Sequence, residues 1–205
     1  LSVRGIVSVS DSADTTTGGI VGINHGTLIS CQFTGVVTGD SEVGGIVGRN
    51  ESEGTIDHST ARAIVTGKSS TGGIAGYNLG AITGCTNVGS INTEYQEASL
   101  DTDGFTAKMV DYINNKMAAA DNDATNSVTN VATDTGGIAG RSSGMILTSV
   151  NTGTVGYEHI GYNVGGIVGR TDGLVSGCVN QGHVLGRKDV GGIAGQAEPY
   201  RELDL

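Results

Sequence analysis

The feature that most constrains this chain is a five-residue motif, Gly-Gly-Ile-(Val/Ala)-Gly, which occurs six times in 205 residues. The copies begin at positions 18, 44, 72, 136, 165 and 191, so the intervals between them are 26, 28, 64, 29 and 26 residues. A period of this length is typical of repeat proteins, in which each repeat packs only on its neighbours. The repeat also explains the composition, because 36 Gly with a single Pro fit neither collagen nor a Pro/Gly-rich disordered tract.

A second signature, Gly-x-(Ile/Leu/Val), follows every copy but the last, and a Val or Ile lies eleven residues beyond its Gly in each case. Fixed segments with β-branched residues, joined by connections of variable length, are typical of strands and corners. In the second repeat the three expected strands cover 45–47, 55–57 and 63–66. Stacking the repeats would align three apolar columns: Ile20, Ile46, Ile74, Ile138, Ile167 and Ile193; Leu28, Ile56, Ile82, Ile146 and Val175; Val37, Val65, Ile91, Val155 and Val184.

These columns predict an all-β fold, a right-handed parallel β-solenoid of about six three-stranded coils, in a single domain over residues 1–205. Full burial of each column residue contributes about 1.5–3 kcal/mol, which outweighs the about 0.5–1 kcal/mol that a strand glycine costs. Other repeats fit less well. A leucine-rich repeat needs Leu-x-x-Leu-x-Leu, and the calcium-binding nonapeptide needs an Asp that none of the six copies has. A dinucleotide fingerprint would occur once and would open a helix.

The motifs resemble a known family. The segments Gly-Gly-Ile-Val-Gly-Arg-Asn at 44–50 and Gly-Gly-Ile-Ala-Gly-Tyr-Asn at 72–78, with Asn-x-Gly-x-(Val/Ile) at 87–91, 151–155 and 180–184, are similar to GLUG-motif repeats. The resemblance covers nearly all of the chain outside one long insertion. It implies the setting of a large bacterial surface protein, such as an adhesin or the non-catalytic part of an IgA-specific metallo-endopeptidase.

The insertion, residues 94–135, is the distinctive segment of the chain. Apolar residues at helical spacing, among them Phe105, Met109 and Tyr112, predict an amphipathic helix near 105–120. Repeat proteins place insertions on one face, which is often the binding face, so these three residues are candidates for a partner-binding surface. Packing of the helix on the solenoid is the competing interpretation.

Cysteine and asparagine follow the repeat and therefore predict structural roles. One register reads Cys31, Ser59, Cys85, Ser149 and Cys178. Because neighbouring cysteines are two or more coils apart, at least about 9.6 Å, we expect free, buried or half-buried thiols. Another register holds Asn87, Asn151 and Asn180, whose amides are expected to hydrogen-bond along the solenoid axis.

Carboxylates are the remaining candidates for chemistry. Asp40 and Glu42 are expected at one corner, Glu158 at the equivalent corner two or more coils away, and Asp57 stands beside His58. None of them recurs in register with a basic or aromatic platform for sugars, so they are expected to be solvated corner residues that complete the candidate partner-binding surface. The four histidines show no metal-ligand spacing, and we expect no metal and no cofactor.

These features favour a non-enzymatic segment of a secreted or cell-surface bacterial protein that acts as a stiff spacer or as an adhesion module. The expected partners are a host or cell-surface protein or glycan and the remainder of a larger polypeptide. A net charge of −10 argues against nucleic acid, and no apolar run is long enough for membrane insertion. The expected location is extracellular, at the bacterial cell surface or cell wall. Two alternatives remain: part of a β-helical carbohydrate-active enzyme, or an accessory region of a large surface metalloprotease.

Overall fold

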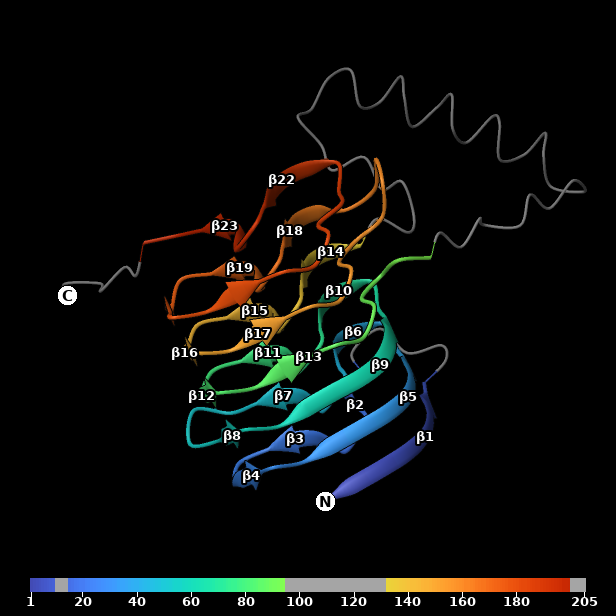
Figure 1. Ribbon diagram of the computed structural model, residues 1–205, viewed down its shortest axis with the longest axis vertical. Helices are drawn as coiled ribbons and strands as arrows, with labels where there is room; N and C mark the ends of the chain where they lie inside the picture. The colour runs from blue at the N-terminus through green and yellow to red at the C-terminus, as the bar shows by residue number, and fades with distance from the viewer. Residues whose placement is uncertain (10–14, 95–131, 200–205) are drawn as a thin grey trace, which may run out of the picture. The chain divides into compact units, whose positions relative to one another are not determined.

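A computed structural model describes residues 1–9, 15–94 and 132–199, which form a parallel β-solenoid of about six turns and contain no helix (Figure 1). The contacts divide the chain into one unit, Leu1–Tyr95 with Val131–Leu205, and a second unit, Gln96–Asn130, that lies outside the described residues. The expected helix near 105–120 falls there, so it stays a prediction, as do the right-handed winding and the single domain over 1–205. The last residues of the expected insertion, 133–135, belong to a solenoid strand.

The solenoid has four sheets, which we call A to D, and neighbouring strands in each sheet are parallel. Sheet A contains β1 (Ser2–Ser8), β5 (Gln32–Thr38), β9 (Thr60–Thr66), β13 (Thr86–Asn87), β17 (Val150–Asn151) and β21 (Val179–Asn180). Sheet B contains β2 (Thr17–Gly18), β6 (Ser41–Gly44), β10 (Ser69–Gly72), β14 (Thr133–Gly136), β18 (Tyr162–Gly165) and β22 (Lys188–Gly191). Sheet C contains β3 (Val21–Asn24), β7 (Val47–Asn50), β11 (Ala75–Asn78), β15 (Ala139–Ser142), β19 (Val168–Thr171) and β23 (Ala194–Ala197). Sheet D contains β4 (Thr27–Ile29), β8 (Thr55–Asp57), β12 (Ala81–Thr83), β16 (Met145–Leu147) and β20 (Leu174–Ser176).

The prediction of three strands per coil was wrong, because sheet B supplies a fourth. Its strands are short and mostly polar, so no apolar run marks them in the sequence. In the middle strands one residue adopts a left-handed conformation, with φ of 48° at Glu42, 51° at Ser70 and 54° at Asp134. The expected strand at 45–47 was misplaced as well: positions 45 and 46 form the corner between β6 and β7. The strand at 55–57 is confirmed as β8, and 63–66 lies within β9.

The three apolar columns are confirmed and form the core. Ladder pairs join Ile56 to Ile82 and Ile82 to Ile146, and parallel bridges join Val65 to Ile91 and Ile91 to Val155. These six side chains are fully buried. Column residues are exposed to solvent at the outermost coils. In the last coil, for example, Ile193 is 41% exposed.

Stacked amides satisfy two series of buried polar positions. As predicted, Asn87 Nδ2 donates to Asn151 Oδ1 at 2.8 Å, and Asn151 Nδ2 donates to Asn180 Oδ1 at 2.9 Å. A second amide ladder was not predicted. It follows the ends of the sheet C strands through Asn24, Asn50, Asn78 and Ser142, with bonds of 2.8, 2.9 and 3.0 Å. Buried polar groups with such partners escape the penalty for unpaired groups, which is about 1–3 kcal/mol each.

The double glycine is required because backbones approach each other closely at the corner between sheets B and C. A Cβ on Gly44 would lie 1.9 Å from the carbonyl oxygen of Val47 in the same coil. A Cβ on Gly73 would lie 2.2 Å from the carbonyl oxygen of Gly137 in the next coil. The first glycine therefore permits the corner, and the second permits the coils to stack.

Gly73→Ala and Gly192→Ala place the same methyl group at equivalent positions of two coils. At Gly73 the methyl group would overlap backbone, so we expect the free energy of unfolding to fall by about 3 kcal/mol or more. Nothing lies within 4 Å of a Cβ at Gly192, so we expect a change within about 0.5 kcal/mol there. Denaturant unfolding followed by circular dichroism measures both. Equal destabilisation by the two variants would contradict the stacking argument.

Candidate functional site

The structure does not gather the predicted surface residues into one cluster. Phe105, Met109 and Tyr112 lie outside the described residues. Asp40 pairs with Lys68 at 2.9 Å, and Glu158 pairs with His159 at 3.6 Å in an exposed loop. Glu42 instead pairs with an arginine of sheet C, described below. The described ranges contain no group of three or more His, Cys, Asp or Glu side chains that could hold a metal ion.

A basic and aromatic ladder on the outer face of sheet C was missed by the sequence reasoning, which expected no such platform. Ladder pairs place Arg49 beside Tyr77, Tyr77 beside Arg141, and Arg141 beside Arg170. In each strand the residues before and after this position are buried, whereas the ladder residue is half-buried. We call these four residues the arginine ladder. The signal for it was the residue that follows each Gly-Gly-Ile-(Val/Ala)-Gly motif.

Tyr77 lies between two guanidinium groups. The Cζ atoms of Arg49 and Arg141 lie 5.2 and 5.3 Å from the centroid of its ring. Each distance is within the range for a cation–π contact, which contributes about 0.5–1 kcal/mol at an exposed site. The phenol oxygen of Tyr77 lies 3.3 Å from the hydroxyl of Ser143, and either group could be the donor. Tyr77 thus contacts Arg141 through its ring and Ser143 through its hydroxyl.

Two of the three arginines in the ladder have carboxylate partners. Arg49 donates from Nε to Glu42 at 2.8 Å and from a terminal nitrogen to the same carboxylate at 2.5 Å, and its other terminal nitrogen lies 3.7 Å from Glu51. Arg170 donates to Glu198 at 2.6 Å. These hydrogen bonds raise the pKa of both guanidinium groups above its usual value. Arg49 and Arg170 are therefore already neutralised by their own chain.

Arg141 differs from its neighbours, because no ion pair joins it to any residue that the structure describes. In its own coil, Asp134 occupies the position that corresponds to Glu42. Asp134 is only 8% exposed and its Oδ1 accepts a hydrogen bond of 2.7 Å from Asn163. The shorter side chain of Asp134 therefore bonds to Asn163 within the corner. The charge of Arg141 is left for a group outside the described chain.

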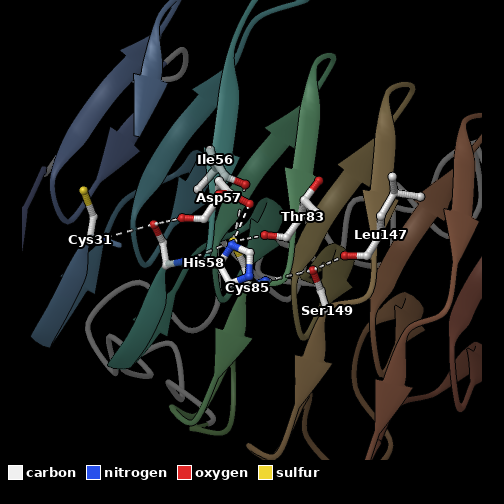
Figure 2. Close-up of polar contacts among 9 residues, drawn as sticks. Cys31, Ile56, Asp57, His58, Thr83, Cys85, Leu147 and Ser149 are labelled. Carbon is white, nitrogen blue, oxygen red and sulfur yellow. Dashed lines mark hydrogen bonds and ion pairs between the residues drawn. The ribbon is translucent and has the colours of Figure 1, made fainter. Parts of the chain in front are cut away.

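The cysteine register is confirmed as a structural column (Figure 2). The amide of Cys31 donates to Ser59 Oγ at 3.1 Å, and the amide of Ser59 donates to Cys85 Sγ at 3.4 Å. The amide of Cys85 in turn donates to Ser149 Oγ at 3.2 Å, and each of these side chains donates to the carbonyl two residues earlier. The register thus needs a small side chain that both donates and accepts, which Ser and Cys provide.

The thiols of this column are free and poorly suited to nucleophilic chemistry. Cys31 and Cys85 are buried and Cys178 is half-buried. Burial raises the pKa of the Cys85 thiol to about 12, and it also raises the pKa of Cys178. A reactive cysteine needs the thiolate, so the raised pKa makes Cys85 and Cys178 inert at neutral pH.

Asp57 and His58 form a hydrogen-bonded pair without a nucleophile. Nδ1 of His58 lies 2.8 Å from Oδ1 of Asp57, and the side chain of His58 is 67% exposed. Among the described residues, no hydroxyl or thiol is hydrogen-bonded to this imidazole. The contact between nucleophile and base that marks a catalytic triad is therefore not formed in the described part of the chain.

Comparison with known proteins supports the resemblance found in the repeats. The family model described as the GLUG motif matches residues 39–66. This segment runs from the residues before β6 to the end of β9 and so corresponds to one coil of the solenoid. No match was found among curated proteins or among solved structures. A helix able to cross a membrane is not present in the described part of the chain.

Cys85→Ser gives a test of the buried thiol that depends on pH. Below pH 9 the thiol is protonated in both the folded and the unfolded chain, so it adds no pH dependence. Between its ordinary pKa of 9.0 and the folded value of about 12, only the unfolded chain ionises, and the wild type loses stability. We expect the free energy of unfolding of the wild type, relative to Cys85→Ser, to fall by about 2–3 kcal/mol from pH 8 to about pH 11. Serine already occupies this register at Ser59 and Ser149, so the variant should fold. Parallel pH profiles for the two proteins would show that the thiol is not desolvated.

Proposed function

We propose that this chain is a non-enzymatic segment of an extracellular bacterial surface protein, in which the β-solenoid serves as a stiff spacer or an adhesion module. The observation that carries the proposal is the repetition of the same interactions from coil to coil. Apolar columns, amide ladders and the Cys/Ser column all continue along the axis. Such continuity resists bending, because each coil is held by both neighbours.

The groups that could perform chemistry support the same proposal. Asp40 and Glu42 are paired with Lys68 and Arg49, which lowers the availability of these carboxylates for acid–base catalysis. The thiol of Cys85 has its pKa raised to about 12 and serves as a hydrogen-bonding link between coils. The half-buried arginine ladder is the described surface best suited to contact a partner. Extracellular location and bacterial origin rest on the resemblance to GLUG-motif repeats in surface proteins.

Incubation of the purified chain with neutral and acidic polysaccharides tests the non-enzymatic role. We expect no increase in reducing ends, as hydrolysis would give, and no absorbance from unsaturated sugars, as a lyase would give. Glu42→Gln and Asp40→Asn serve as matched variants, because a carbohydrate-active enzyme would use these carboxylates. Turnover by the wild type that is lost in either variant would establish the alternative of a carbohydrate-active enzyme and overturn the proposal.

A further inference from the structure

The arginine ladder has one unfilled place for a carboxylate, at Arg141. Guanidinium groups in this ladder take carboxylates where the chain supplies them, from Glu42 at Arg49 and from Glu198 at Arg170. At Arg141 the described chain supplies none, because Asp134 is bonded to Asn163. The planar guanidinium carries five N–H donors and matches a carboxylate in a two-point contact. An external carboxylate would therefore complete the pattern.

The groups beside Arg141 restrict what carries that carboxylate. The hydroxyls of Tyr77 and Ser143 lie 3.3 Å apart, and each can both donate and accept. Tyr77 is the ladder partner of Arg141 on the adjacent strand, and Ser143 follows Arg141 by two residues. A hexuronate carries a carboxylate and several hydroxyls on one small ring. It can therefore reach groups on two adjacent strands, which lie about 4.8 Å apart. An acidic peptide side chain supplies the carboxylate but has no hydroxyls for Tyr77 and Ser143.

The wider charge distribution favours a short glycan over a polyanion. The chain has a net charge of −10, and Glu198, Asp134 and Asp172 lie close enough to Arg170 to raise its pKa. Long polyanions would be repelled by this field, whereas a single carboxylate at Arg141 is attracted locally. Nucleic acid is disfavoured for the same reason.

We propose that Arg141, Tyr77 and Ser143 form a binding site for a hexuronate residue of a glycan. The guanidinium of Arg141 holds the carboxylate, and the hydroxyls of Tyr77 and Ser143 contact the ring hydroxyls. The ring of Tyr77 also contacts the guanidinium, whose Cζ lies 5.3 Å from the ring centroid. The site gives the proposed adhesion module a class of ligand, and it rests on that proposed function.

Titration of the full chain with trigalacturonate, followed by calorimetry, tests the site. We expect saturable binding, and binding about ten- to a hundredfold weaker for Arg141→Gln, because a hydrogen bond to a charged group is lost. The methyl ester of trigalacturonate, which keeps the hydroxyls but not the charge, should lose affinity to the same extent. Tyr77→Phe and Ser143→Ala should each weaken binding several-fold.

Arg62→Gln is the matched control, because it removes the same charge from an exposed arginine on the outer face of sheet A. It should leave affinity unchanged, and circular dichroism should confirm that every variant folds like the wild type. No saturable binding, equal loss in Arg62→Gln, or equal affinity for triglutamate would each overturn the hexuronate site. Cleavage of bound trigalacturonate would instead overturn the non-enzymatic function while leaving the contact at Arg141 in place.

Discussion

The close approach of backbones at the corner between sheets B and C is the constraint on which the rest of the solenoid depends. A Cβ on Gly44 or Gly73 would overlap a backbone carbonyl oxygen, so no other residue fits without moving backbone. The corner fixes where sheet B ends and sheet C begins in every coil. Once these corners stack, the register of all other strands follows, because a slip of one residue would turn each apolar side chain outward.

Stacking in register brings each side chain next to its own equivalents, and this decides how the buried polar groups are satisfied. An amide carries both a donor and an acceptor. In a column of Asn such as Asn87 and Asn151, each side chain can therefore donate a hydrogen bond to the equivalent side chain of the next coil. The same logic explains why Ser59 and Cys85 alternate in one column. The cysteines, which look most reactive in the sequence, thus form hydrogen bonds between stacked coils.

The apolar columns and the Asn87 ladder could be predicted because their spacing is constant and one residue type dominates each register. Sheet B could not, since its strands are marked by corner geometry at residues such as Glu42 rather than by hydrophobic residues. The arginine ladder was also hidden: its register begins with Ile23, ends with Gln196 and includes Tyr77, so it shows no single chemistry. Its character appears only when adjacent strands place these side chains side by side.

The half-buried position of each sheet C strand, which the arginine ladder occupies, can differ from coil to coil with little loss of stability. Its neighbours along the strand are buried and fixed by stacking, whereas the ladder residue itself is only half-buried. A change from Glu to Asp at that corner, between Glu42 and Asp134, shortens the side chain by one methylene. The carboxylate then turns inward to Asn163 and no longer reaches the arginine of its own coil. A difference of one methylene in an otherwise uniform scaffold is thus enough to leave one guanidinium of the arginine ladder, that of Arg141, for a ligand.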